Sequence, residues 1–289
     1  CSSDLQLAEY YKVTNHPAEA DSEMVRAFDN PALDAKSKLQ ILGSFYSNEE
    51  FFGSRKATTF RLMDKAMGEC SDSTEFAAFY GNVLLLQEKY PAAARQFELA
   101  LRQDSSQYEL WEMLLVSLSE TPDAEERLAS YALRASRLFP MHTLPYFLLA
   151  RQALIDNRYS EALKWLDQTE KWGFSNGYLE AETYALLAEA CYRTGHYERA
   201  WRAFDHSLAL KPDDWVLLNN YAYYLSEQGT ELAKAEQMSR RTIEAEPDNA
   251  NSLDTYAWIL HLLGRDAEAL PYMEKAESIN PDSDTLRRH

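Results

Sequence analysis

One pattern of glycine, proline and alanine recurs in this chain about every 35 residues, and it strongly limits the possible folds. Its glycines and prolines keep the same spacing: Gly195, Gly229 and Gly264, then Pro212, Pro247 and Pro281. Alanines recur with them at Ala93, Ala129, Ala162, Ala200, Ala235 and Ala269. Glycine tolerates the positive φ that often ends a helix, and proline cannot continue one. Each period therefore predicts two short helices joined by a tight turn.

The clearest copy of this unit covers residues 184–212, with its turn at Thr194 and Gly195. Its apolar residues form two stripes at helical spacing: Leu187, Ala188 and Cys191, then Tyr197, Ala200, Phe204 and Leu208. The small residues Ala188 and Ala200 fall where the two helices would cross. We therefore expect the two backbones to approach closely there, with both stripes buried.

This unit resembles a tetratricopeptide repeat, which spans 34 residues and carries small and aromatic residues at fixed positions before a final proline. Seven of eight successive units match, so the resemblance covers nearly the whole chain. It implies an all-α fold, an α-solenoid in which about eight helix-turn-helix repeats stack into a right-handed superhelix. We expect one solenoid over residues 1–289. It has a regular and a degenerate repeat in 1–70 and six more regular repeats in 71–289.

The second unit departs from the pattern. Residues 33–46 and 55–67 have helical spacing, but the connector 48–53 places Phe51 and Phe52 side by side. These rings either pack under the neighbouring repeat or form a small exposed contact site. The polar segment 70–74 is predicted to be a bend in the array.

Composition limits the possible partners. The formal net charge is −17, which disfavours nucleic acid, because binding to phosphates depends on Lys and Arg. The acidity either keeps a large surface soluble or favours basic partners. No apolar run approaches the roughly 18 residues of a membrane span, so no transmembrane segment is expected.

The first residue, Cys1, is followed by two serines, as in a mature bacterial lipoprotein whose cysteine carries lipid. Alternatively, Cys1 only marks where the sequence begins. The last two units also resemble the terminal repeats of tetratricopeptide lipoproteins of the bacterial cell envelope, whose relatives act as adaptors. This resemblance implies a periplasmic or outer-membrane location with an N-terminal lipid anchor on Cys1; the alternative is the cytoplasm.

No motif of a catalytic or metal site occurs in the sequence. We find no H-E-x-x-H, phosphate-binding loop, G-x-G-x-x-G or G-x-S-x-G, and the three cysteines are too widely spaced for a zinc site. His196 falls in a predicted turn, as a solvated residue would. We therefore expect a non-enzymatic protein with neither a metal nor another cofactor.

The resemblance implies that the first helix of each repeat lines a concave groove that contacts a protein or peptide. Helical geometry predicts which side chains lie opposite the buried stripe. They are Asn82, Phe147, Arg151, Glu189, Tyr192, Asn219, Tyr223, Asp254, Trp258 and His261. Asn219, Tyr223, Asp254 and Trp258 form the densest polar and aromatic group. Tyr223 and Trp258 either anchor a partner or fill the space between adjacent first helices.

These observations favour a scaffold or adaptor that binds a protein or an extended peptide in its groove. Two other hypotheses remain. The chain could be a structural subunit of a larger assembly, or a regulator with a small-molecule pocket beneath the second unit, near Phe51 and Phe52. The sequence predicts neither the partner nor the oligomeric state.

Overall fold

The computed structural model of the chain describes residues 2–46, 56–69, 73–174 and 176–281. Within these residues every regular element is an α-helix, sixteen in all, which confirms the predicted all-α fold. Three features discussed above lie outside the described residues: Cys1, the pair Phe51 and Phe52, and positions 70–72 of the predicted bend.

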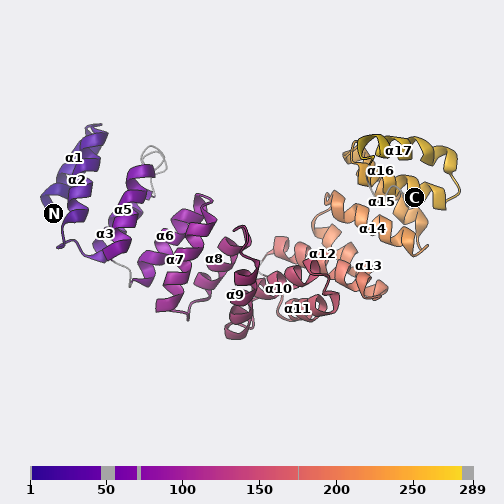
Figure 1. Cartoon of the computed structure of the whole chain (residues 1–289), viewed down its shortest axis with the longest axis horizontal. Coiled ribbons are helices and arrows are strands. Elements are labelled where there is room, and N and C mark those ends of the chain that lie inside the picture. Colours follow the sequence, from indigo (N-terminus) through magenta and orange to yellow (C-terminus); the bar gives the residue numbers. More distant parts are fainter. Residues whose placement is uncertain (1, 47–55, 70–72, 175, 282–289) are drawn as a thin grey trace. The chain divides into compact units, whose positions relative to one another are not determined.

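Contacts between Cα atoms divide the chain into two compact units, and the first is Cys1–Phe139. The described helices of this unit follow one another in pairs along the chain (Figure 1). They are α1 (Ser2–Val13) with α2 (Pro17–Asp29), α3 (Ala35–Tyr46) with α5 (Lys56–Glu69), α6 (Thr74–Leu86) with α7 (Tyr90–Gln103), and α8 (Tyr108–Ser119) with α9 (Glu125–Leu138). The degenerate second unit of the sequence therefore still supplies two helices, as predicted.

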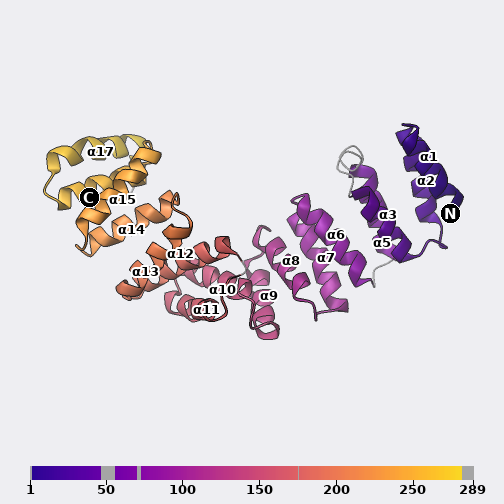
Figure 2. The same ribbon diagram turned by 180° about the vertical axis from the view of Figure 1, so that it is seen from behind.

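The second compact unit is Pro140–His289, and it contains the repeats with the clearest sequence pattern. Its helices also follow one another in pairs when the chain is seen from behind (Figure 2). They are α10 (Leu144–Ile155) with α11 (Tyr159–Trp172), α12 (Gly177–Arg193) with α13 (Tyr197–Leu210), α14 (Trp215–Glu227) with α15 (Leu232–Ala245), and α16 (Ala250–Leu262) with α17 (Asp266–Ile279). We call these the fifth to eighth repeats. A single continuous solenoid over both units stays a prediction.

The described turns between the two helices of a repeat contain residues in the left-handed region. Gly195, Gly229 and Gly264 have φ values of 80°, 62° and 74°, as predicted from their spacing. After Gly195 the chain returns at once, because His196 N–H donates to Cys191 O at 2.8 Å. In other repeats a residue with a side chain has positive φ near the turn, namely Asn15, Glu88, Asp123 and Asn157, and in the seventh repeat Glu231 has positive φ as well as Gly229. The positive φ thus recurs from turn to turn, although the type of residue that adopts it differs.

The predicted apolar stripes form the core of each pair. In the sixth repeat Leu187, Ala188, Cys191, Ala200 and Phe204 are all buried. Tyr197 is exposed and Leu208 is half-buried, so the outer edge of the second stripe contacts solvent. The core is therefore narrow and runs along the line where the two helices meet.

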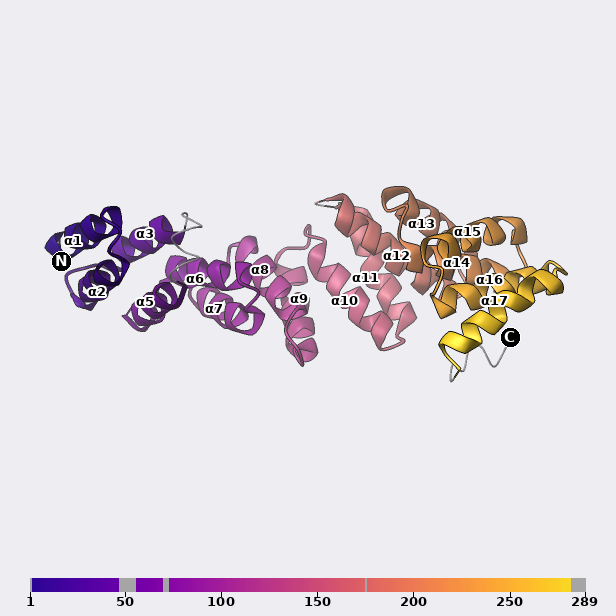
Figure 3. The same ribbon diagram turned by 90° about the horizontal axis from the view of Figure 1, so that it is seen from above.

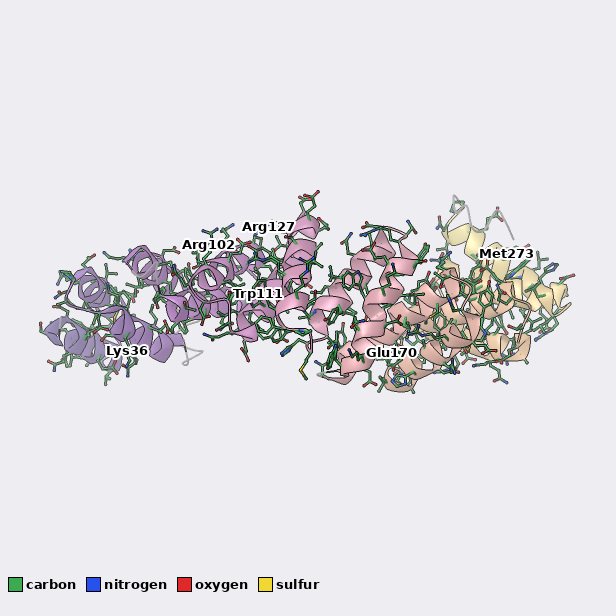
Figure 4. All side chains as sticks on the ribbon, turned by 90° about the horizontal axis from the view of Figure 1, so that it is seen from below. Lys36, Arg102, Trp111, Arg127, Glu170 and Met273 are labelled. Carbon is green, nitrogen blue, oxygen red and sulfur yellow. The ribbon has the colours of Figure 1, made fainter. Side chains whose placement is uncertain are left out.

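The first unit is packed in the same way. Trp111 on α8 is completely buried, and its indole N–H donates to Ser105 O at 3.0 Å. Figure 4 labels Trp111 among the helices of this unit and Arg127 at its outer edge. Where α6 crosses α7, the backbone at Gly81 lies so close to the ring of Phe97 that a Cβ atom would stand 2.8 Å from it.

Neighbouring pairs pack through the second helix of one pair and the first helix of the next. This arrangement holds for α11 with α12 and for α15 with α16, and Figure 3 shows these helices from above. The first helices also contact one another, α10 with α12 and α14 with α16. Among the residues that the structure describes, no helix is both long and apolar enough to cross a membrane.

Candidate binding groove

A pocket lies between the first helices of the seventh and eighth repeats, α14 and α16. Each helix begins with a side-chain cap beside it: Asp214 Oδ1 accepts from Leu217 N, and Asn249 Oδ1 accepts from the backbone N–H groups of Asn251 and Ser252. Such caps satisfy N–H groups that have no partner within the helix. They fix the position at which each helix starts, and thereby which side chains face the pocket.

The pocket has a volume of about 250 Å³. Its walls combine amides, hydroxyls, two carboxylates and two aromatic rings. The lining residues are Trp215, Val216, Asn219, Asn220, Tyr223, Glu246, Asn249, Asn251, Ser252, Asp254 and Thr255. Three of the predicted groove residues, Asn219, Tyr223 and Asp254, thus share one pocket. Trp258 is not among its lining residues.

Asn219 is the least satisfied polar side chain of this pocket. Its Oδ1 is buried and has no hydrogen-bond partner among the described residues. An unsatisfied buried acceptor costs about 1–3 kcal/mol, and therefore a ligand that donates a hydrogen bond here is favoured. Asp254 faces the same pocket and is only 3% exposed.

A carboxylate ties Tyr223 to the sixth repeat. Glu227, one turn after Tyr223 on α14, accepts from Tyr223 OH at 2.9 Å and from Tyr192 OH at 2.6 Å. Burial and this carboxylate together raise the pKa of Tyr192 well above its usual range. Tyr192 therefore remains a neutral donor, and its bond to Glu227 connects α12 to α14.

A second carboxylate makes the reciprocal contact. Glu189 on α12 accepts from Tyr224 OH at 2.7 Å and from Arg193 Nε at 2.7 Å. Burial is the main cause of the raised pKa of Tyr224, and Glu189 adds to it. Because Arg193 also donates to Tyr224 OH at 3.2 Å, these three side chains form one closed network.

The other predicted groove residues lie in separate places. Trp258 and His261 pack together on α16 with ring centroids 5.5 Å apart, and His261 Nδ1 lies 2.7 Å from Asp266 Oδ1. In the fifth repeat the guanidinium of Arg151 lies 6.0 Å from the ring centroid of Phe147. Asn82 is exposed and belongs to the first unit.

The predicted face is not uniformly exposed. Phe147, Tyr192 and Asp254 are buried, contrary to the expectation for a surface opposite the core stripe. The reason is that a first helix contacts the first helices of its neighbours as well as its own partner, which covers part of the groove side. Trp258 and Tyr223 are half-buried.

Sequence analysis missed several residues of this region, above all Glu227, Tyr224, Trp215 and Asn249. A signal existed for Glu227, because residues four apart on a helix are neighbours, and Tyr223 precedes it by four. Asn249 could have been found as a helix cap before residues 250–262. Tyr224 offered no such signal, since its partner Tyr192 is distant in sequence.

No metal site is evident in the described part of the chain: residues 2–46, 56–69, 73–174 and 176–281 contain no group of three His, Cys, Asp or Glu that could hold an ion. Cys191 is buried, and burial raises the pKa of its thiol to about 11. This shift is opposite to that of a reactive cysteine, whose thiolate must form near neutral pH.

A family model for the tetratricopeptide repeat matches residues 181–214 and 250–283, which are the sixth and eighth repeats. The chain therefore contains tetratricopeptide repeats. Its curated relatives include the TPR repeat-containing protein PA4667 of Pseudomonas aeruginosa, 33% identical over 106 residues. That match covers 36% of this chain and 18% of the relative. The human protein O-mannosyl-transferase TMTC1 is 29% identical over 111 residues, which are 37% of this chain and 13% of that protein.

Solved structures agree with the tetratricopeptide-repeat fold. YrrB, described as a TPR protein with an unusual peptide-binding site, superposes with a TM-score of 0.58 at 18% identity, covering 68% of this chain and 97% of YrrB. PilW, a type IV pilus biogenesis factor, has a TM-score of 0.58 at 15% identity, covering 74% of this chain and 97% of PilW. At these identities the similarity shows the fold alone, and this fold is typical of scaffolds for protein–protein interaction.

Proposed function

We propose that this protein is a non-enzymatic adaptor that binds an extended protein segment along the first helices of its second unit. One observation carries the proposal: the pocket between α14 and α16 holds a buried acceptor, Asn219 Oδ1, without a partner among the described residues. Half-buried Tyr223 stands beside it, and aromatic side chains with polar neighbours are typical anchors of recognition surfaces. The description of YrrB, which names a peptide-binding site, supports peptide recognition on this fold.

The transferase relative does not favour an enzyme here. Its match covers 13% of that protein, and we infer that the similarity reflects the repeats.

We also propose that the chain is an envelope lipoprotein, with support from the fold shared with a pilus biogenesis factor. The mass of the N-terminal peptide from the native organism tests the lipid on Cys1. An unmodified cysteine would contradict it.

Photo-crosslinking in the native host tests the adaptor function. A benzoylphenylalanine is placed at Val216, which lines the pocket and is 67% exposed. The matched control carries it at Leu270 on α17, which is also exposed and does not line the pocket. We expect a crosslinked protein from Val216 only, and its loss when Tyr223→Ala or Trp258→Ala is added. Undiminished crosslinking in both variants would contradict the proposed groove.

An assembly subunit is the main alternative, and sedimentation separates the two. A chain that remains a monomer at low concentration would exclude a role based mainly on contacts between its own copies. The third hypothesis, a small-molecule pocket near Phe51 and Phe52, concerns residues outside those described.

A further inference from the structure

The pocket between α14 and α16 is rich in hydrogen-bond acceptors. Besides Asn219 Oδ1 it contains the carboxylates of Glu246 and Asp254, whereas no Lys, Arg or His occurs among the described residues that line it. We propose that this pocket binds a lysine or arginine side chain of the segment that occupies the groove. The inference rests on the proposed function and names the chemistry of the partner.

The acceptors match a cation in kind. Ammonium and guanidinium groups only donate hydrogen bonds, so each of their N–H groups needs an acceptor. Glu246 is held in place, because its Oε2 accepts from Asn249 Nδ2 at 2.7 Å. Its other oxygen remains as an acceptor toward a ligand, beside the buried oxygen of Asn219. Hydrogen bonds that involve charged groups are stronger than neutral ones.

The basic residues near the pocket already have partners within the chain. Lys211 Nζ lies 2.5 Å from Glu182 Oε1, and Arg241 Nη2 donates to Pro212 O at 3.2 Å. The guanidinium of Arg241 also lies 5.8 Å from the ring centroid of Trp215, at the edge of the pocket. Neither Lys211 nor Arg241 lines the pocket. A positive charge beside Glu246 and the buried oxygen of Asn219 would therefore come from the partner. The formal net charge of −17 adds a long-range attraction for such a partner.

The walls also fit the shape of a long basic side chain. Trp215 and Tyr223 provide aromatic surface for an aliphatic stem and, in the case of a charged head group, cation–π attraction. A volume of about 250 Å³ lies below the roughly 300–1,000 Å³ of most small-molecule sites, which suits one side chain of a peptide. A neutral sugar could use the amides and the rings, but the two carboxylates and the absence of a lining cation favour the basic side chain.

NMR titration of the full chain tests this inference. The probes are acetyl-lysine-methylamide and acetyl-arginine-methylamide, with the norleucine and citrulline analogues as neutral controls of the same shape. The side-chain amide of Asn219 and the indole of Trp215 report binding. The variants are Glu246→Gln and Asp254→Asn, and the matched control is Glu244→Gln, an exposed residue of α15 that does not line the pocket.

We expect the charged probes to bind about tenfold tighter than their neutral analogues, because hydrogen bonds that involve a charged group are stronger than neutral ones. Glu246→Gln removes most of this preference and Glu244→Gln leaves it intact. Asp254 is buried, so Asp254→Asn can also destabilise the fold. If its melting temperature is lowered, the cation preference is judged from Glu246→Gln alone. Equal binding of charged and neutral probes would overturn the inference. It would also be overturned if chitotriose, a neutral sugar, changed the chemical shifts of Asn219 and Trp215 and the lysine probe did not. Crosslinking from Val216 is independent of these outcomes, so the adaptor function can stand if the cation preference fails.

Discussion

The rings of Tyr192 and Tyr224 stack face to face, with centroids 3.8 Å apart and planes inclined by 14°. They come from the first helices of the sixth and seventh repeats, and each hydroxyl donates to a carboxylate of the other helix. Stability in a repeat protein is approximately a sum of repeat stabilities and interface contributions. This stack therefore contributes to one interface, and its removal has a measurable cost.

Tyr224→Ala is expected to lower the free energy of unfolding of the second unit by about 3 kcal/mol, the usual cost of removing a buried aromatic ring. Tyr224→Phe keeps the stack and loses the bond to Glu189, so it should cost about 1 kcal/mol. Urea denaturation followed by circular dichroism measures both. The control is Tyr178→Ala, at a ring that is 69% exposed. Similar losses for Tyr224→Ala and Tyr178→Ala would show that the stack contributes little.

Gly81→Ala should destabilise the third repeat by about 1–3 kcal/mol, because overpacking forces a close neighbour to move. The added methyl group would stand 2.8 Å from the ring of Phe97, which is itself completely buried. Gly68→Ala on α5 is the matched control, since a Cβ there meets nothing within 4 Å. It should be neutral or stabilising by up to about 1 kcal/mol. Thermal melting distinguishes the two, and equal melting temperatures would argue against the close crossing of α6 and α7.

Asn219→Ala should separate stability from binding. It removes a buried acceptor that has no partner among the described residues, and this gain offsets the packing lost with the side chain, so the free energy of unfolding should change by less than about 1 kcal/mol. Crosslinking from Val216 should nevertheless fall, because the ligand loses its acceptor. The measurement pairs urea denaturation with crosslinking yield. A strongly destabilised variant would indicate that Asn219 is structural.

Alkaline pH should destabilise the second unit. Burial raises the pKa of Cys191 from 9.0 to about 11 and also raises the pKa values of Tyr192 and Tyr224 above 10.0. A raised pKa in the folded state means that the unfolded chain releases its proton first. Stability is therefore complete below pH 9 and declines as the pH rises toward 11 and beyond. Urea midpoints across this range, with tyrosinate absorbance as a second readout, test the direction.

Thiol labelling gives a separate measurement in a Cys1→Ser, Cys70→Ser background. At pH 8 the raised pKa and the burial of Cys191 should make its reaction with a disulfide reagent far slower in the folded than in the urea-unfolded chain. Comparable rates in the two states would contradict the buried position.

The sequence alone predicted the helix pairs, because a regular repeat contains its own turn residue, its own apolar residues at helical spacing and a proline after its second helix. Gly195 and Phe204 illustrate this: the first has positive φ and the second is buried, as their spacing indicates. Local spacing also placed Asn219 and Tyr223 on the same side of α14. These properties depend on one helix or one turn, where periodicity is informative.

The network between repeats could not be predicted in the same way. Whether Tyr192 meets Tyr224 depends on how two first helices approach, which no local pattern specifies. For the same reason the buried position of Asp254 was missed, because neighbouring first helices cover part of the groove side. The left-handed residue Glu88 shows a further limit, since glutamate does not signal a positive φ.

The bridge from Glu227 to Tyr192 and Tyr223 also affects the entropy of binding. Its two hydrogen bonds hold the Tyr223 ring in one orientation before any ligand arrives. Ordering a flexible side chain at an interface costs about 0.5–1.5 kcal/mol, and here most of that loss has already occurred during folding. A segment that binds against Tyr223 therefore contacts a side chain that is already ordered.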